Sequence, residues 1–291
     1  MLPQNKRPPD IGEYVNANSI DAALAALADG QATLLAGGSD LWAQKDSGNG
    51  RIGRRLVNVN RVPDLRGISE SAGRIRIGAL TTMSEILESD LLARRVPVLV
   101  DAADHFASPQ IRNVASVGGN IANASPAADM VLPLIVLDAV ARVRSVDGER
   151  DIPVSGVAIA PGKTCLRPEE LITAVEFETP STSFHAAFQK SGSRPALEIS
   201  IVAMCLGGGL AGSVLADPRL VFGAVGPTAI RCRKTESLIG GRVLTDDLIA
   251  RALDAMAGEI APIDDVRASV WYRTHVARTF LKEELSRCRQ A

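Results

Sequence analysis

The amino-acid sequence predicts an α+β protein built from two domains. Beyond about residue 180, strand-like segments follow one another and then give way to helical segments, which is typical of an antiparallel sheet with helices on one face. Before that point, short strands alternate with helices, and Asp147-Gly148 supplies a tight turn between two strand-like segments. At 291 residues the chain is long enough for two domains. We therefore expect one domain over residues 1–179 and a second over residues 180–291.

The first domain is predicted to begin with a helix followed by a buried strand. Ser19 is a suitable N-cap, residues 20–29 are rich in Ala and Leu, and Gly30 stands where a helix-ending glycine belongs. Thr81 or Thr82 is a suitable cap for a longer helical segment that extends to residue 106. The other predicted elements are strands within 31–38, 56–60, 74–80 and 171–180, an apolar helix within 128–139, and a hairpin over 140–154.

The second domain is predicted to contain strands within 183–192, 198–206 and 219–225, and helices within 235–241, 245–260 and 270–288. Residues 207–212 match the glycine spacing of a dinucleotide-binding fingerprint. That fingerprint must open a helix, whereas a strand-like segment containing Pro218 follows. We interpret these glycines as a hairpin loop.

Composition excludes several classes of partner. The net charge of −1 gives no electrostatic attraction toward nucleic acid or acidic membranes. The N-terminal segment has no apolar region typical of a secretory signal, and no apolar run reaches the length of a membrane span. The sequence therefore predicts a cytoplasmic protein without a membrane span.

Cysteine and histidine spacing predicts no metal site. Cys165, Cys205, Cys232 and Cys288 lie far apart and never form a C-x-x-C pair. The three histidines, His105, His185 and His275, show no helical i, i+4 pairing. No nucleophile and base can be assembled from the sequence, so we predict no catalytic residue on this chain. A redox cofactor that supplies its own chemistry would fit such a protein.

Two glycine-rich segments are the strongest candidates for ligand binding. They are Ala36-Gly37-Gly38-Ser39-Asp40, after a predicted strand, and Ser116-Val117-Gly118-Gly119-Asn120-Ile121, after a loop. Paired glycines let the backbone approach a ligand and direct successive N–H groups at one anion. Neither segment contains Lys or Arg, so a bound diphosphate would depend mainly on backbone donors and hydroxyls.

These segments resemble the flavin subunits of the xanthine dehydrogenase and carbon monoxide dehydrogenase family of molybdenum hydroxylases. LLAGGSDL is similar to the first FAD-binding segment of that family, and ASVGGNIANASPAAD is similar to the second. PGKTCLRPEELITAVEFETP, FQKSGSR and FGAVGPTAIRCRKTESLIGG continue the pattern in order, so the resemblance spans roughly residues 8 to 285. It implies an FAD-binding domain of the p-cresol methylhydroxylase (vanillyl-alcohol oxidase) type in two halves, about 1–55 and 56–179, followed by a C-terminal α+β domain.

The resemblance also implies which residues contact FAD. Residues 34–41 would wrap the diphosphate, residues 116–120 would close the opposite side, and Phe106 would lie against the cofactor. Asp129 would accept hydrogen bonds from hydroxyls on the flavin side, Ile172 would give a backbone contact, and Lys190 would place a cation near the ring. The complete predicted set is Leu34, Leu35, Ala36, Gly37, Gly38, Ser39, Asp40, Leu41, Phe106, Ser116, Gly118, Gly119, Asn120, Asp129, Ile172 and Lys190.

The function implied by the resemblance is electron transfer inside a complex. Electrons would leave a molybdopterin cofactor on a large subunit, pass through 2Fe-2S clusters on a small subunit, and reach an acceptor such as NAD or oxygen through FAD on this chain. The expected assembly is a dimer of heterotrimers. Two alternatives are a stand-alone FAD-dependent oxidase and a structural subunit that has lost FAD. The sequence names neither the substrate nor the acceptor.

Overall fold

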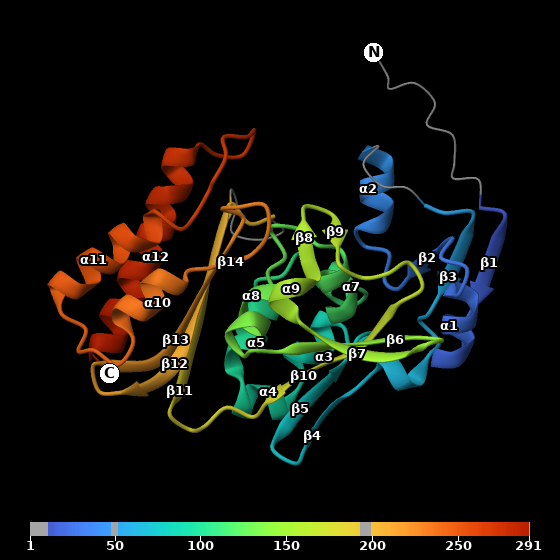
Figure 1. Ribbon diagram of the computed structural model, residues 1–291, viewed down its shortest axis with the longest axis horizontal. Coiled ribbons are helices and arrows are strands. Elements are labelled where there is room, and N and C mark those ends of the chain that lie inside the picture. Colours follow the sequence, from blue (N-terminus) through green and yellow to red (C-terminus); the bar gives the residue numbers. More distant parts are fainter. Residues whose placement is uncertain (1–10, 48–51, 193–198, 291) are drawn as a thin grey trace.

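The computed structural model describes residues 11–47, 52–192 and 199–290. Figure 1 shows three layers of structure in a row: the blue N-terminal half, the green second half, and the orange C-terminal domain. Their sheets have three, five and four strands, and a two-stranded pair, β8 (Ala158–Ala160) with β9 (Lys163–Thr164), accompanies the second half. The second half therefore touches both of its neighbours.

The first half is a parallel three-stranded sheet with one covering helix. Its strands lie in the order β1 (Glu13–Asn16), β3 (Arg55–Asn58) and β2 (Ala32–Leu35). Helix α1 (Ile20–Leu27) begins as predicted, because the Ser19 side chain accepts a hydrogen bond from the Ala22 N–H. The division predicted at about residue 55 falls at the start of β3, which pairs with β1 and β2 and so belongs to this half.

The second half contains an antiparallel sheet of five strands. Their order is β4 (Ile68–Ser71), β5 (Arg74–Gly78), β10 (Leu171–Glu178), β6 (Val140–Ser145) and β7 (Gly148–Pro153). Strands β6 and β7 form the predicted hairpin. The last strand of this sheet ends at Glu178 and the next strand begins at Phe184, so the predicted domain boundary lies between two sheets.

The predicted helical segment over 81–106 is divided into three helices. They are α3 (Met83–Leu87), α4 (Asp90–Arg95) and α5 (Pro97–Asp104). Thr82 forms a capping box with Glu85, Ser89 caps α4, and Pro97 opens α5 where no backbone N–H is required. The remaining helices before residue 180 are α2 (Leu41–Ser47), the 3₁₀ turn η1 (Pro63–Leu65), α6 (Pro109–Arg112), α7 (Val117–Ala122), α8 (Val131–Val136) and α9 (Val154–Val157).

The C-terminal domain is an antiparallel sheet covered by helices on one face (Figure 1). Its strands are β11 (Phe184–Ser191), β12 (Val202–Ala211), β13 (Val214–Gly223) and β14 (Ile230–Arg231), and its helices are α10 (Arg233–Ile239), α11 (Asp246–Ala257) and α12 (Val270–Gln290). The predicted hairpin exists, but its turn is at residues 212–213 and the preceding glycines lie inside β12. A Cβ on Gly207 would meet the Val136 side chain at 2.6 Å, so close packing on α8 explains a glycine in this strand.

The sheet of the C-terminal domain is buried on both faces. In β12, Ala203 and Cys205 belong to the core shared with the second half, while Val202 and Met204 belong to the core under the helices. Successive side chains of a strand point to opposite faces, so this strand reads as a continuous apolar run. A shared core fixes the C-terminal domain against the first domain.

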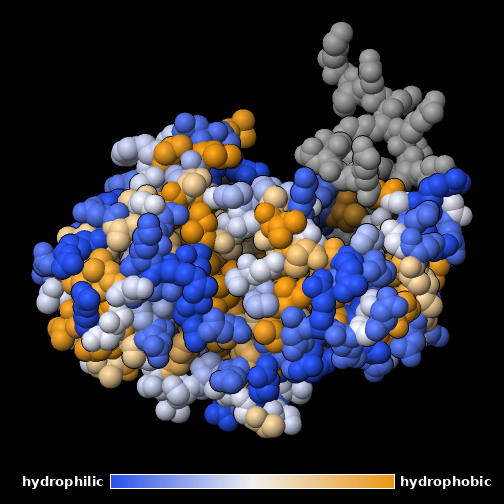
Figure 2. Space-filling view, in the orientation of Figure 1, coloured by the Kyte–Doolittle hydropathy of each residue, from blue (hydrophilic) through white to orange (hydrophobic). Residues whose placement is uncertain are grey.

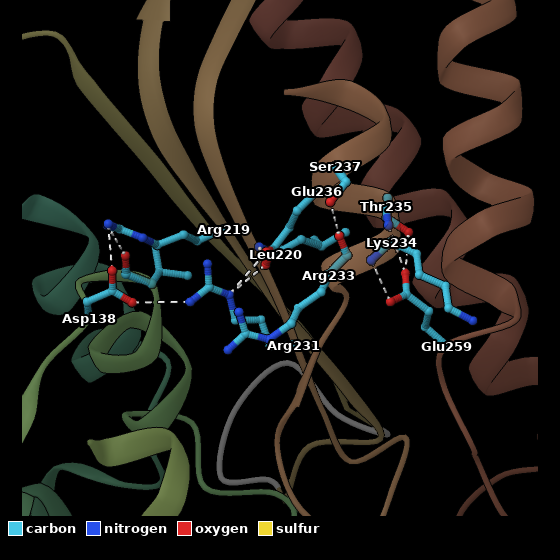
Figure 3. A network of polar contacts seen from close by, with 11 residues as sticks. Asp138, Arg219, Leu220, Arg231, Arg233, Lys234, Thr235, Glu236, Ser237 and Glu259 are labelled. Atoms are coloured by element: carbon cyan, nitrogen blue, oxygen red, sulfur yellow. Dashed lines mark hydrogen bonds and ion pairs between the residues drawn. The ribbon is translucent and has the colours of Figure 1, made fainter. Parts of the chain in front are cut away.

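Ion pairs reinforce the contact between these domains. Figure 3 shows Asp138, which follows α8, directed at Arg219 of β13 and Arg231 of β14. The Asp138 Oδ2 atom lies 2.6 Å from Arg219 Nη2, and Oδ1 lies 3.2 Å from Arg231 Nη1. Arg231 also pairs with the buried Glu236 of α10, which links the interface to the helical layer.

On the face shown in Figure 2, hydrophobic residues are scattered among hydrophilic ones. Over the described ranges, none of the helices combines the length and the apolar character that crossing a membrane requires.

Candidate functional site

A large cavity lies where the two halves of the first domain meet the C-terminal domain. Its volume is about 550 Å³, within the range of about 300–1,000 Å³ typical of small-molecule and cofactor sites. Residues from the β2–α2 connection, from α7 and from the start of β10 form its walls, and Ile199 of the C-terminal domain reaches its edge.

The first wall is the connection between β2 and α2. Within the described part of the chain, the backbone N–H groups of Gly37, Gly38, Ser39 and Asp40 donate no hydrogen bond. Gly37 and Gly38 are half-buried, where an N–H group normally finds an acceptor, whereas Ser39 and Asp40 are exposed. Four successive free donors beside a cavity fit a bound anionic group. This is the arrangement that the sequence predicted for a diphosphate.

The glycines of this wall also have a structural role. A Cβ on Gly37 would lie 1.8 Å from the carbonyl oxygen of Val114, so only glycine lets the first half approach the second half at this point. Gly38 has φ +66°, in the left-handed region that glycine adopts without strain. A Cβ there would meet Trp42 and Leu35, away from the cavity.

The second wall is the start of α7, where the sequence predicted a glycine turn. Ser116 caps this helix, and both glycines lie in its first turn. The N–H groups here are already bonded: Val117 to Thr81, Gly118 to Ala79, and Gly119 and Asn120 to Ser116. This wall would therefore bind a ligand mainly through its side chains and not through backbone N–H groups.

Asn120 is a residue of the second wall with an unsatisfied polar atom. Its Oδ1 atom is buried and has no hydrogen-bond partner in the described part of the chain, although the residue lines the cavity. An unsatisfied buried polar atom costs about 1–3 kcal/mol. A ligand donor, such as a hydroxyl, would satisfy it.

Gln44 connects the two walls. Its Nε2 atom lies 2.6 Å from Asn123 Oδ1, at the end of α7, and it also donates to Asp40 Oδ2. All three residues line the cavity. This link holds α2 of the first half on α7 of the second half beside the ligand space.

Asp129 lies at the bottom of the cavity and is 5% exposed. Its Oδ2 atom lies 2.6 Å from Lys190 Nζ, and its Oδ1 atom accepts from the buried hydroxyl of Ser200. Burial raises the pKa of the Asp129 carboxyl, while the Lys190 ammonium opposes this shift. Lys190 also donates to the backbone oxygen of His105 at 2.9 Å. The lysine thus joins the C-terminal domain to the first domain through Asp129.

The start of β10 forms a third side of the cavity. The Glu170 carboxylate is 2% exposed and is held by Arg150, with Nε–Oε1 at 2.7 Å, and by the Arg167 N–H at 2.7 Å. The Arg150 guanidinium lowers the pKa of the Glu170 carboxyl. The register of β10 shifts between Ile172 and Ala174, which bends the strand where Ile172 lines the cavity.

Fourteen of the sixteen predicted contact residues line this cavity, whereas Leu35 and Lys190 do not. Those that line it are Leu34, Ala36, Gly37, Gly38, Ser39, Asp40, Leu41, Phe106, Ser116, Gly118, Gly119, Asn120, Asp129 and Ile172. Lys190 lies behind Asp129. Gln44, Asn123 and Glu170 line the cavity but were missed, because a single glutamine, asparagine or glutamate carries no spacing signal in a sequence.

Two family descriptions together cover most of the chain. Residues 9–180 match the FAD binding domain in molybdopterin dehydrogenase, and residues 186–287 match the CO dehydrogenase flavoprotein C-terminal domain. The chain belongs to this family of FAD-binding subunits. It is thus an oxidoreductase subunit of the xanthine and carbon monoxide dehydrogenase type, as the motifs predicted.

Relatives of this family match along nearly their whole length. The xanthine dehydrogenase FAD-binding subunit of Escherichia coli O157:H7 is 34% identical over 280 residues, which cover 95% of this chain and 96% of that one. The 6-hydroxypseudooxynicotine dehydrogenase complex subunit alpha of Paenarthrobacter nicotinovorans is 34% identical over 292 residues, or 97% and 95% of the two chains.

A solved structure confirms the fold. A chain of carbon monoxide dehydrogenase from Hydrogenophaga pseudoflava superimposes with a TM-score of 0.92 at 27% identity, covering 98% of this chain and 100% of that one. The α+β architecture predicted for both domains is therefore correct.

The residues of the cavity fit the cofactor of the family. Free N–H groups on the first wall suit a diphosphate, the buried Asn120 oxygen suits a hydroxyl donor, and the apolar side chains of Leu34, Leu80 and Phe106 suit a ring system. Gly119 leaves space on the second wall: outside its own helix backbone, a Cβ there would meet only the Ser116 hydroxyl within 4 Å.

Proposed function

We propose that this chain transfers electrons, through FAD held in the cavity, from 2Fe-2S clusters of a small partner subunit to an external acceptor such as NAD or oxygen. The complex would also contain a large molybdopterin subunit that hydroxylates the substrate. The four free N–H groups of the first wall are the observation that carries this proposal. The unsatisfied Oδ1 atom of Asn120, a residue that lines the same cavity, supports it.

The first wall would hold the diphosphate of FAD by its backbone donors and by the Ser39 hydroxyl, which also lines the cavity. Asn120 would accept from a hydroxyl of the cofactor. Gln44 would keep the two walls together, and the Glu170–Arg150 pair would hold the start of β10 in place. Bound FAD would supply the conversion of single electrons into an electron pair.

The carboxylates around the cavity favour electron transfer over direct oxidation of a substrate. Three carboxylates line it, and each already has a partner: Asp129 has Lys190, Glu170 has Arg150, and Asp40 has Gln44. A direct oxidase needs a group free to accept a proton from the substrate. The stand-alone oxidase is therefore the weaker alternative.

The substrate would be selected on another subunit. The relatives named above differ in what their names say they act on, xanthine in one case and 6-hydroxypseudooxynicotine in the other, at the same 34% identity to this chain. A flavin subunit that collects electrons from a common 2Fe-2S partner does not need to contact these compounds.

A titration of the flavin-free chain with FAD, FMN and ADP tests this proposal. We expect one FAD per chain, weaker binding of FMN, and competition by ADP, because the free N–H groups would hold the diphosphate that FMN lacks. The visible spectrum and equilibrium dialysis would give stoichiometry and affinity. Absence of FAD binding would support the structural-subunit alternative instead, and equal affinity for FMN would contradict the role of the first wall.

A further inference from the structure

Strand β11 separates two polar sites by the alternation of its side chains. Phe188 and Lys190 face the FAD-binding domain, where Lys190 pairs with Asp129. His185 faces α12 on the opposite side of the sheet, and its Nε2 atom lies 2.7 Å from Glu284 Oε1. This second site is outside the lining of the cavity and has no role in the function proposed above.

Three potential metal ligands converge at this second site. The Nε2 atom of His185, a carboxylate oxygen of Glu284 and the Sγ atom of Cys288 all lie within 4.8 Å of one another. Over the described ranges, no other group of three His, Cys, Asp or Glu side chains does so. The sequence predicted no metal site because only closely spaced ligands form a recognisable pattern, whereas His185 is 99 residues from Glu284.

The geometry of α12 holds two of these ligands in place. Glu284 and Cys288 are four residues apart on a helix of 21 residues, so they lie on the same face, toward the sheet. Both are 1% exposed. The Glu284 Oε2 atom accepts from Gln189 Nε2 at 3.3 Å and from Arg287 Nη1 at 3.2 Å, which directs Oε1 toward His185 and Cys288.

The ligand set is of the kind that zinc binds. Zinc takes imidazole nitrogen and carboxylate oxygen at about 2.0–2.1 Å and thiolate sulfur at about 2.3 Å, in tetrahedral geometry. These lengths put the nitrogen and oxygen ligands roughly 3.3 Å apart and the sulfur and oxygen ligands roughly 3.5 Å apart. The corresponding distances are 2.7 Å for His185–Glu284 and 3.9 Å for Cys288–Glu284. Both pairs are therefore within well under 1 Å of the separations that zinc requires, and His185 Nε2 and Cys288 Sγ lie within 4.8 Å of each other.

We propose that His185, Glu284 and Cys288 bind one zinc ion, with water in the fourth position. Zinc would enter from the solvent side of His185, whose side chain is 34% exposed. Binding would release two protons to solvent, one from the Cys288 thiol and one from His185 Nε2, which otherwise donates to Glu284 Oε1. A carboxylate and a thiolate balance the charge of the ion. The metal would tie β11, at the edge of the sheet, to α12.

Zinc titration of the full chain tests this site without reference to the flavin. A chelator removes metal first, zinc chloride is then added, and bound zinc is counted by mass spectrometry after gel filtration. We expect one zinc per chain. His185→Gln and Cys288→Ser should each weaken binding at least about 100-fold, since loss of a residue that merely supports a ligand typically costs about 10- to 100-fold.

Matched controls separate this site from unspecific binding. His275→Gln removes a histidine of the same helix that stacks on Trp271, and Cys232→Ser removes a buried cysteine of the same domain. Both should keep full zinc affinity. Should Cys288→Ser fail to fold, the unfolding midpoint still decides, because zinc should raise it for wild type and His275→Gln but leave it unchanged for His185→Gln. No zinc on the wild-type chain, or zinc retained by His185→Gln, would overturn the proposal.

Discussion

The two glycine pairs that face each other across the cavity look alike in the sequence but differ in the structure. Gly37 and Gly38 lie in the β2–α2 connection, where the N–H groups are free. Gly118 and Gly119 lie in the first turn of α7, where the N–H groups are bonded. A Cβ on Gly37 would strike the backbone of the second half, and one on Gly119 would stand beside the ligand space.

This difference teaches that a glycine beside a cofactor can be required for two separate reasons. Gly37 is needed so that two parts of the chain can touch, and Gly119 is needed so that a ligand has room. Substitution of Gly37 should therefore lower both the stability of the chain and its flavin content. Substitution of Gly119 should lower the flavin content alone.

Gly37→Ala should have the largest effect. The added methyl group would lie 1.8 Å from the Val114 carbonyl oxygen, so the two halves must separate, and the free energy of unfolding should fall by about 1–3 kcal/mol. FAD content should be lost at the same time, because the first wall moves away from the second. Thermal unfolding and the flavin spectrum measure the two effects. Gly156→Ala is the control, because a Cβ there meets nothing within 4 Å. A Gly37→Ala chain with normal stability would show that the close contact does not matter.

Gly119→Val should weaken FAD binding while the flavin-free chain stays folded. Overpacking of about 2.7 kcal/mol corresponds to about 100-fold in affinity. Gly119→Ala should show a smaller loss, because its side chain extends less far toward the ligand. Titration with FAD and thermal unfolding of the flavin-free variants test this. Equal affinities for wild type and Gly119→Val would remove α7 from the binding site.

Asn120→Leu should change stability and affinity in opposite directions. Leucine has a similar size and removes the orphaned Oδ1 atom, so the flavin-free chain should be as stable as wild type or more stable. Loss of one hydrogen bond should weaken FAD binding by about 10-fold, or about 1.4 kcal/mol. If affinity is unchanged and stability falls, Asn120 serves the fold instead of the ligand.

The pH dependence of stability should show a smaller effect, at Glu170. Its pKa is lowered in the folded chain, chiefly by Arg150, from an ordinary value of 4.5. A depressed carboxyl pKa contributes stability above the unfolded value, and this contribution is lost as the pH falls through the lower folded value. Wild type should therefore lose more stability than Glu170→Gln below about pH 4.5. Chemical unfolding at several pH values measures both slopes, and parallel slopes would contradict a stabilising Glu170–Arg150 pair.

The fold and most of the candidate site could be predicted from the sequence because their signals are local. Ser19, Thr82 and the Asp147-Gly148 turn act on neighbouring residues, and they form the predicted caps and hairpin. The glycine motifs likewise marked the cavity walls. The place of β3 could not be predicted in this way, since pairing with β1 and β2 depends on residues distant in the chain.

The contacts that the sequence did not reveal join residues far apart in the chain. Lys190 is 61 residues from its partner Asp129, Gln44 is 79 residues from Asn123, and His185 is 99 residues from Glu284. Each contact depends on how sheets and helices pack together, and no residue spacing in the sequence predicts it. The contacts between separate sheets and helices are therefore the features that the structure reveals and the sequence does not.

Reduction of the bound flavin by the partner subunit tests the electron-transfer account most directly. The electron donor is the small 2Fe-2S subunit, which is identified by its co-purification with this chain, then separated from it and reduced chemically. The substrate of the complex therefore need not be known. Anaerobic stopped-flow absorbance follows the flavin band after mixing with the FAD-loaded chain. We predict rapid loss of flavin absorbance with the reduced small subunit, and none when the oxidised small subunit is used. An unchanged flavin band after mixing with the reduced small subunit would contradict the account.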